Sequence, residues 1–140
     1  MDSINSESFC KKIKANREFL QDLLDFIEET LDQLRCAHDL RFKLLIASEE
    51  ILVNIMDYAY PDQEGELEIK LAKDDSFIQL IFIDQGRPYN PLENTNDPRT
   101  LDLEDREPGG LGIIMVKEFM DKVEYRYEAQ SNILTLSKKI

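Results

Sequence analysis

The chain has 140 residues, of which 42% are hydrophobic and 33% are charged. This balance is typical of a globular protein and excludes a disordered chain, and the length corresponds to one domain spanning residues 1–140. The formal net charge of −12 repels phosphate backbones and anionic lipids, so no direct binding to nucleic acid or membrane is expected. Met1 leads into a polar stretch, and no apolar run is long enough to span a bilayer, which predicts a cytoplasmic protein.

Two helices are predicted in the first half of the chain. Within residues 16–35, apolar residues recur at three- and four-residue spacing, as on the buried face of an amphipathic helix. These residues are Phe19, Leu20, Leu23, Leu24, Ile27, Leu31 and Leu34. A second helix is predicted from about residue 40 to 58, with Pro61 as a stop signal. Residues 9–15 fit either an edge strand or part of the first helix.

The second half of the chain is dominated by short strands. Residues 67–72 and 77–83 predict one hairpin, and residues 123–127 and 133–136 predict another, which turns at residues 130–132. Tight turns join strands that pair antiparallel. We therefore expect an α+β two-layer sandwich, with helices on one face of a mixed, mainly antiparallel sheet.

A long polar segment separates the two hairpins. Residues 87–108 contain four prolines and many Asn, Asp and Thr residues, and they run into Gly109-Gly110-Leu111-Gly112 and a short apolar helix ending near Met120. Loops of this length in a compact domain are uncommon, and they are usually lids, binding loops or disordered segments. The segment is therefore a candidate lid.

The first candidate group lies in the middle of the second helix. Glu50 and Asn54 are four residues apart and share a helix face, which Asp57 extends. An amide oxygen suits Mg²⁺, and a carboxylate one turn away can deprotonate an attacking hydroxyl. A solvated helix edge has the same pattern, so the pair alone does not specify a site.

The second candidate group follows directly from a predicted strand. Asp84, directly after residues 77–83, can accept a hydrogen bond from an exocyclic amine such as that of adenine, and Gly86 permits close approach of the backbone to a flat ring. An ordinary Asp-Gly turn is the alternative.

The third candidate group is the glycine-rich run before the last helix. Backbone N–H groups at a helix start can hold phosphate oxygens, which makes Gly110, Leu111 and Gly112 candidates for phosphate binding. The run matches neither a Walker A loop nor the dinucleotide fingerprint. A hinge for the lid is the alternative, and one loop could serve both purposes.

Taken in order, the three groups resemble the N, G1 and G2 boxes of the GHKL (Bergerat-fold) ATPases. Glu50 to Asn54 is similar to the N box, Asp84-Gln85-Gly86 to the G1 box, and Gly110-Leu111-Gly112 to the G2 box. Residues 47–54, the Tyr-Ala-Tyr-Pro run at 58–61 and residues 84–91 resemble the branch of anti-sigma-factor serine/threonine kinases. The resemblance covers most of the chain from about residue 16 onward.

This resemblance implies ATP and Mg²⁺ as cofactors, with Glu50 as the general base and Asn54 as the metal ligand. Asp84 would recognise adenine by a hydrogen bond. The nucleotide-binding positions that it implies are Asn54, Asp84, Gly86, Gly110, Leu111 and Gly112.

Two positions depart from the family pattern. Tyr58 stands where several relatives have His, and Pro108 precedes the glycines where some members have Arg. Lys117, Arg106 and Arg99 could supply positive charge near the phosphates, or they could be surface residues.

By the same resemblance, the chain phosphorylates Ser or Thr on a small anti-anti-sigma (STAS-type) partner and sequesters a sigma factor, and it forms a homodimer. A nucleotide-gated binding protein without phosphoryl transfer is the alternative. The catalytic part of a histidine kinase is a third reading, but the first predicted helix carries no phospho-accepting His.

Overall fold

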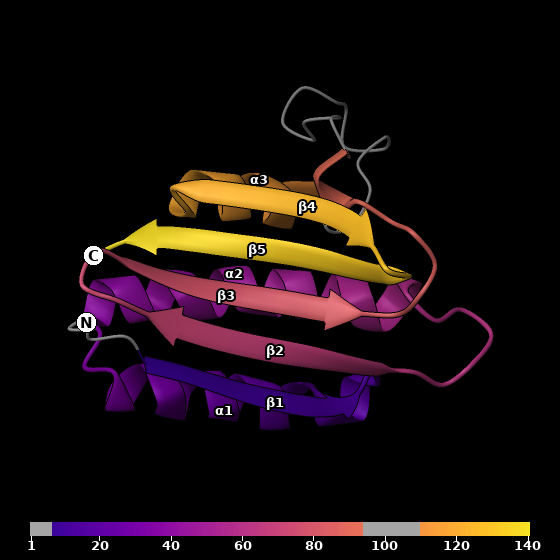
Figure 1. The fold of residues 1–140 in the computed structure, drawn as a ribbon, viewed down its shortest axis with the longest axis horizontal. Coiled ribbons are helices and arrows are strands. Elements are labelled where there is room, and N and C mark those ends of the chain that lie inside the picture. The colour runs from indigo at the N-terminus through magenta and orange to yellow at the C-terminus, as the bar shows by residue number, and fades with distance from the viewer. Residues whose placement is uncertain (1–6, 94–109) are drawn as a thin grey trace.

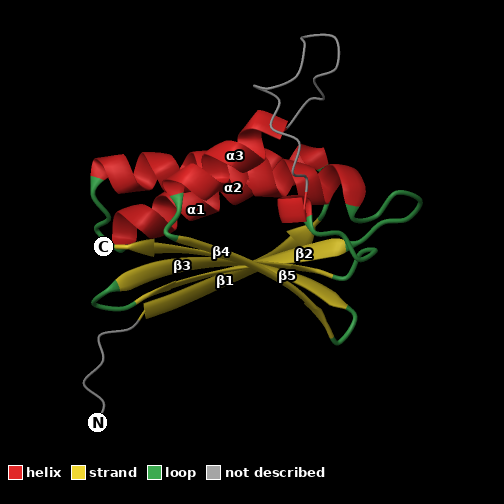
Figure 2. Ribbon diagram, turned by 90° about the horizontal axis from the view of Figure 1, so that it is seen from above, coloured by secondary structure: helices red, strands yellow, loops and turns green. Residues whose placement is uncertain are grey.

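The computed structural model describes residues 7–93 and 110–140. Their strands form one five-stranded sheet in the order β1-β2-β3-β5-β4, and the helices cover one of its faces (Figures 1 and 2). The elements, in chain order, are β1 (Glu7–Lys14), η1 (Arg17–Phe19), α1 (Leu20–Gln33), α2 (His38–Tyr58), β2 (Glu66–Lys73), β3 (Phe77–Asp84), η2 (Pro91–Glu93), α3 (Gly110–Phe119), β4 (Lys122–Glu128) and β5 (Ser131–Lys139). The predicted α+β two-layer architecture is confirmed.

The sheet differs from the prediction in one respect. Its four strand pairings, β1 with β2, β2 with β3, β3 with β5 and β5 with β4, are all antiparallel. The expected parallel component of a mixed sheet is therefore absent among the described strands. Short turns join β2 to β3 and β4 to β5, and strands joined in this way pair antiparallel. β1 also runs antiparallel to β2, and β3 to β5.

The segment before the first helix is an edge strand. β1 pairs with β2 from Lys14 opposite Glu66 to Glu7 opposite Lys73. Its side chains alternate in exposure, and Phe9 and Ile13 pack against the core. This alternation with period two decides between the strand and the helix that the sequence left open.

The second hairpin turns earlier than predicted. Ala129 and Gln130 form its turn with φ of 52° and 62°, a backbone conformation that suits a two-residue hairpin loop. Ser131 and Asn132 already pair with Glu128 and Tyr127, so the predicted turn at residues 130–132 was wrong. The consequence is functional, because Asn132 belongs to a strand and faces the covered side of the sheet.

The core lies between the helices and the sheet. α1 contributes Leu23, Ile27 and Leu31, as its periodicity predicted, and its start is preceded by Asn16, whose side chain accepts a hydrogen bond from the N–H of Glu18. Full burial of such an aliphatic side chain contributes about 1.5–3 kcal/mol. From α2, α3 and the sheet, the fully buried hydrophobic side chains are Leu44, Ala47, Ile51, Leu52, Leu67, Ile69, Leu71, Ile78, Leu80, Phe82, Val116 and Leu136.

Asp84 at the end of β3 pairs with Asn132 at the beginning of β5, and both line one pocket with Asn54 and Ile55 of α2. The end of β3 and the beginning of β5 therefore lie beneath the C-terminal half of α2. α3 packs along α2. The three candidate groups thus lie on adjacent elements at one end of the sheet. Among the described residues, no helix is long and apolar enough to cross a membrane.

Candidate functional site

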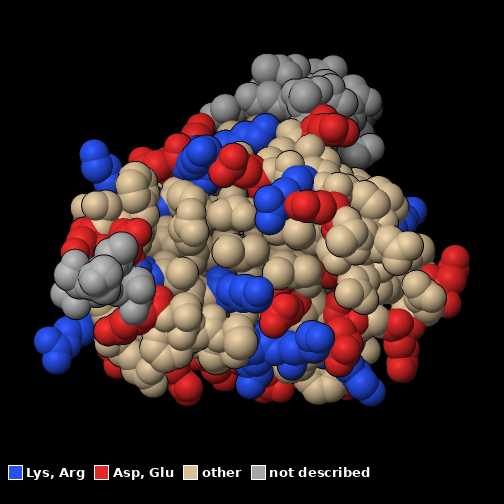
Figure 3. All heavy atoms as spheres, in the orientation of Figure 1, with Lys and Arg blue, Asp and Glu red and all other residues tan. Residues whose placement is uncertain are grey.

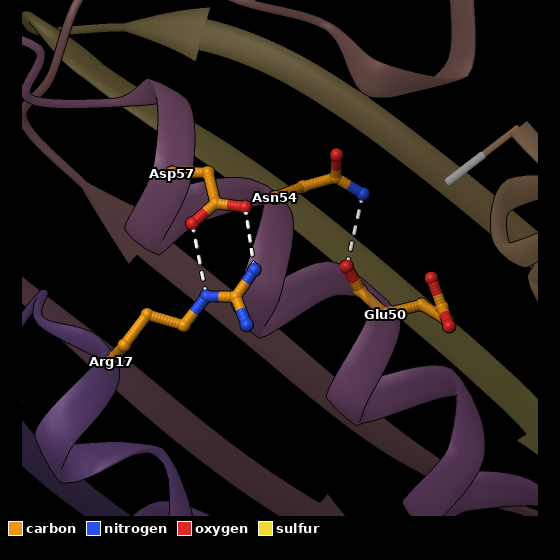
Figure 4. Close-up of polar contacts among 4 residues, drawn as sticks. All are labelled: Arg17, Glu50, Asn54 and Asp57. Atoms are coloured by element: carbon orange, nitrogen blue, oxygen red, sulfur yellow. Dashed lines mark hydrogen bonds and ion pairs between the residues drawn. The ribbon is translucent and has the colours of Figure 1, made fainter. Parts of the chain in front are cut away.

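Glu50 and Asn54 project to the same side of α2 (Figure 4). Asn54 Nδ2 donates a hydrogen bond to the Glu50 main-chain carbonyl at 2.9 Å. Because the nitrogen is held in this way, the amide oxygen of Asn54 is turned away from the helix backbone and is free to accept a metal ion. Asn54 also lines the pocket described below, whereas Glu49 is exposed as expected.

Asp57 does not share this role. Both of its carboxylate oxygens bind Arg17, Oδ1 to Nε at 3.0 Å and Oδ2 to Nη2 at 2.8 Å (Figure 4). Asp57 is therefore engaged by Arg17 and does not join Glu50 and Asn54 in the candidate site. The pair is largely exposed, so solvent screening leaves it only a small contribution to stability.

A pocket opens between the C-terminal half of α2 and the end of β3, and about 370 Å³ of it, partly open to solvent, is not filled by protein atoms. Its polar lining comes from Asn54, Asp84 and Asn132, and Arg87 also lines it. The remaining lining residues are aliphatic or aromatic: Ile51, Ile55, Ala59, Phe82, Tyr89, Pro91, Tyr125 and Leu134. Apolar walls with a few placed polar groups are typical of a small-molecule site.

Asp84 is the buried acidic group of this pocket, with 5% of its surface exposed. Its Oδ1 atom accepts hydrogen bonds from Gly86 N and Asn132 Nδ2, each at 2.9 Å. Burial raises the pKa of Asp84, and these two hydrogen bonds oppose the rise. Within the described part of the chain, Oδ2 accepts no hydrogen bond and is left for a donor in the pocket.

Asn132 organises the polar end of the pocket, and sequence reasoning missed it. Its Nδ2 donates to Asp84 and to the Arg87 carbonyl at 2.9 Å, while its Oδ1 accepts from Tyr89 N at 3.1 Å and from the Tyr125 hydroxyl. One amide thus fixes the carboxylate and the chain that follows it. One feature of the sequence could have indicated it: Asn132 is a polar residue on the same alternating face of the strand as the inward-facing Leu134 and Leu136.

Gly86 is required by packing as well as by any ligand. A Cβ atom at this position would lie 2.2 Å from the Ala59 carbonyl oxygen at the end of α2. The same helix end accepts hydrogen bonds from Arg87, whose N binds Ala59 O at 3.0 Å and whose Nε binds Tyr58 O at 2.9 Å. In this structure the close contact at Gly86 is with α2, and its approach to the flat ring of a ligand stays a prediction.

Gly112 lies against the Glu50 carboxylate. A Cβ atom at position 112 would lie 1.9 Å from Glu50 Oε2, so the glycine leaves the space in which this oxygen lies. Burial raises the pKa of Glu50, and the negative charge of Glu49 raises it further. With a raised pKa, this carboxylate holds a proton more readily than an ordinary glutamate does.

The remaining predicted residues are less centrally placed. Gly110 begins α3 and Leu111 follows it within the same helix. Lys117 donates to the Leu92 carbonyl at 3.1 Å and is exposed. The Tyr58 ring is exposed and packs 5.8 Å from the Tyr89 ring. Most of the candidate lid, with Arg99, Arg106, Pro108 and Gly109, lies outside the described residues.

These residues fit an adenine nucleotide with Mg²⁺. The apolar walls suit a flat ring, and Asp84 Oδ2 can accept a hydrogen bond from an exocyclic amine. Residues 7–93 and 110–140 contain no group of three His, Cys, Asp or Glu side chains that could hold a metal ion. Mg²⁺ commonly takes few protein ligands and completes its shell with phosphates and water, which matches a single amide oxygen at Asn54.

Known proteins are similar to this chain over most of its length. The serine/threonine-protein kinase BtrW of Bordetella bronchiseptica is 29% identical over 83% of this chain and 82% of that protein. The serine-protein kinase RsbW of Halalkalibacterium halodurans is 25% identical over 90% of this chain and 79% of its own length. The anti-sigma F factor of Caldanaerobacter subterraneus is 26% identical over 85% of this chain and 74% of its own length.

Solved structures share the fold. The RsbU and RsbW domains of a Mycobacterium tuberculosis protein superpose with a TM-score of 0.67 at 15% identity, covering 94% of this chain and 31% of that one. The SiaB–SiaC complex of Pseudomonas aeruginosa gives a TM-score of 0.57 at 13% identity, covering 98% of this chain and 91% of that one. A family model for the histidine kinase-like ATPase domain matches residues 13–138. The chain belongs to this ATPase family, as its three sequence boxes and its fold indicate.

Proposed function

We propose that this chain is an ATP-dependent serine/threonine kinase of the anti-sigma-factor type, which phosphorylates a small partner protein. The observation that carries the proposal is the placement of three groups around one end of α2. They are a half-buried carboxylate at Glu50, a free amide oxygen at Asn54 and a buried acceptor at Asp84. The names of the relatives bear out the prediction of a regulatory serine/threonine kinase.

Each group has a separate task in this proposal. Asp84 Oδ2 accepts a hydrogen bond from the adenine amine, while Asn132 holds Asp84 in place. Asn54 is a ligand of Mg²⁺, which, when bound, neutralises charge on the phosphates. Gly110 and Gly112 lie at the beginning of α3, where backbone N–H groups favour anions.

Glu50 is the general base. The partner's Ser or Thr oxygen bonds to the γ-phosphorus, the bond between that phosphorus and the ADP oxygen breaks, and Glu50 takes the hydroxyl proton. The raised pKa of Glu50 suits this step, because a base with a pKa nearer neutrality accepts the proton more readily. Most of the remaining barrier is lowered by positioning and charge stabilisation.

The proposed partners are a STAS-type anti-anti-sigma protein as phosphate acceptor and a sigma factor as sequestered target. The relatives named serine-protein kinase and anti-sigma F factor support this pair. The proposal also includes two structural points. Residues 1–140 form one domain, and two copies of the chain associate as a homodimer.

The test is transfer of labelled phosphate from ATP to candidate partners encoded beside this gene. Label should appear on one partner with the wild type and not with Glu50→Gln, while both proteins bind ADP equally. Nucleotide binding without label on any partner would instead support the nucleotide-gated binding protein. Absence of adenine-nucleotide binding at millimolar concentration, with and without Mg²⁺, would exclude both functions.

A further inference from the structure

A second pocket lies at the opposite end of the sheet from Asp84. It is formed where α1 leads into α2 and where β2 and β5 end, and about 740 Å³ of it, much of it open to solvent, is not filled by protein atoms. Phe77 and Lys139 pair at this end of β3 and β5, whereas Asp84 and Asn132 pair at the other. Seven residues of strand separate the two pairs, which is about 23 Å at 3.3 Å per residue.

Basic side chains dominate the charged lining of this far-end pocket. Arg35, Lys43, Lys73, Lys138 and Lys139 line it, and no Asp or Glu does. The whole chain has 17 Lys and Arg against 29 Asp and Glu. On the sheet face drawn in Figure 3, by contrast, basic and acidic side chains are interspersed. The pocket is therefore a local positive region on an acidic protein.

Within residues 7–93 and 110–140, three of these cations have no acidic partner. Lys73 Nζ donates to the Leu34 carbonyl at 2.7 Å, and Lys138 Nζ lies 3.8 Å from an Asp121 oxygen. The side chains of Arg35, Lys43 and Lys139 form no hydrogen bond or ion pair with any described residue. In a chain with such an excess of carboxylates, unneutralised cations around one pocket favour binding of an external anion.

The lining is also apolar, which narrows the class of ligand. Leu40 is half-buried in the first turn of α2, and Ile140 is 54% exposed. Inorganic phosphate would use the cations but not the aliphatic side chains. An acidic peptide with an aliphatic side chain uses both.

We propose that the far-end pocket binds an acidic segment of a partner protein, with at least one aliphatic side chain of that segment against Leu40 and Ile140. The far-end pocket shares no residue with the nucleotide pocket. It would give the protein a second point of contact with a partner, at a distance from the reacting groups.

The test uses the full chain and a panel of eight-residue peptides of Asp, Glu and Leu, followed by ¹H–¹⁵N chemical shifts and fluorescence anisotropy. Peptides should shift amides near Arg35, Lys43 and Lys139, and binding should weaken as salt rises. The triple variant Arg35→Gln, Lys43→Gln, Lys139→Gln should bind roughly tenfold more weakly, as expected for loss of several exposed ion pairs.

A matched triple variant removes the same net charge elsewhere. Lys12, Lys70 and Lys122 are exposed on strands, line neither pocket, and should tolerate Gln with an affinity loss below about twofold. Equal losses in the two triple variants would overturn the proposal, as would equal binding of peptides with Asn and Gln in place of the acids. So would shifts confined to other surfaces, no binding by any peptide, or pyrophosphate binding the pocket as tightly as the peptides.

Discussion

Glu50 Oε2 lies where a side chain on residue 112 would have to be, since a Cβ atom built on Gly112 would be 1.9 Å from it. Real Cβ contacts of this length do not occur, so any larger residue at position 112 displaces the carboxylate. The glycine of the third sequence box and the carboxylate of the first are thus joined by direct packing between α3 and α2.

Gly112→Ala should therefore impair phosphoryl transfer by moving Glu50. A displacement of about 1 Å can reduce a rate by roughly 10²-fold, so we expect a loss of that order in transfer with a smaller loss in ADP affinity. Rates and ADP binding are measured for Gly112→Ala, Glu50→Gln and the double variant.

The double variant is the control for this prediction. If Gly112→Ala acts through Glu50, it should have little further effect once Glu50→Gln is present. Two full and additive losses would show that Gly112 acts independently of the carboxylate.

The sequence predicted the elements because periodicity and turn residues are local properties. Spacing of three and four residues identified α1, and the hairpin of β2 and β3 was marked by its polar turn. The turn of β4 and β5 was placed too late, because Ala129 and Gln130 are not typical turn residues, whereas Ser131 and Asn132 are. Local propensity there was overridden by the pairing of β5 with β3.

The site was predicted in part for the same reason. Glu50, Asn54 and Asp84 were found from their element positions, and the family assignment made the set specific. Asn132 could not be found in this way, because its role depends on contacts with Asp84, Arg87 and Tyr89, which are 43 or more positions away in the sequence. The ion pair of Asp57 with Arg17 is likewise a long-range contact that helix spacing does not reveal.

Asp84→Asn should weaken ATP binding. The amide can present its N–H₂ group where the adenine amine also donates, and an unpaired buried group costs about 1–3 kcal/mol, or roughly 5–150-fold in affinity. Calorimetry with ATP and GTP measures both affinity and selectivity, and both should fall. Unchanged affinity and selectivity in a folded variant would remove Asp84 from the adenine site.

The same substitution should stabilise the nucleotide-free protein at neutral pH. Burial raises the folded-state pKa of Asp84 above its ordinary value of 3.8, so ionisation costs stability progressively as the pH rises above 3.8, and the full cost is present above the folded-state pKa. Asn carries no such cost, and its advantage should vanish as the pH falls below 3.8. Denaturant unfolding at several pH values checks this, and a pH-independent difference would contradict it.

Ser48→Ala should also stabilise the protein. The Ser48 hydroxyl on α2 is fully buried and has no hydrogen-bond partner among the described residues. Its removal should raise the free energy of unfolding by about 1 kcal/mol. Thr30→Val is the matched control, because the buried Thr30 hydroxyl donates to the Phe26 carbonyl at 2.7 Å and its loss should destabilise. Destabilisation by Ser48→Ala would show that its hydroxyl is satisfied.

Phosphoryl transfer should decline on acidification at a higher pH than an ordinary glutamate would give. The pKa of Glu50 lies above 4.5, and only the ionised carboxylate can take the proton, so the rate falls as the pH drops through this raised pKa. Glu49→Gln should move the midpoint to lower pH, because the charge of Glu49 contributes to the rise. Rates at saturating ATP measure both profiles, and a midpoint unaffected by Glu49→Gln would separate Glu50 from the pH dependence.

Glu50→Gln and Asn54→Ala should fail at different steps, although both residues lie on one side of α2. Gln keeps the size and hydrogen bonding of Glu50 but cannot take a proton, so transfer should fall by roughly 10²–10⁴-fold while nucleotide binding survives. Asn54→Ala removes the free amide oxygen, so it should weaken binding of ATP in the presence of Mg²⁺ more than in its absence. Titrations with and without Mg²⁺, followed by single-turnover transfer, distinguish the two.

If both folded variants lose nucleotide binding equally, the division of roles is wrong. If Glu50→Gln transfers phosphate at the wild-type rate, the base is another group, because the carboxylate against Gly112 then has no part in proton removal.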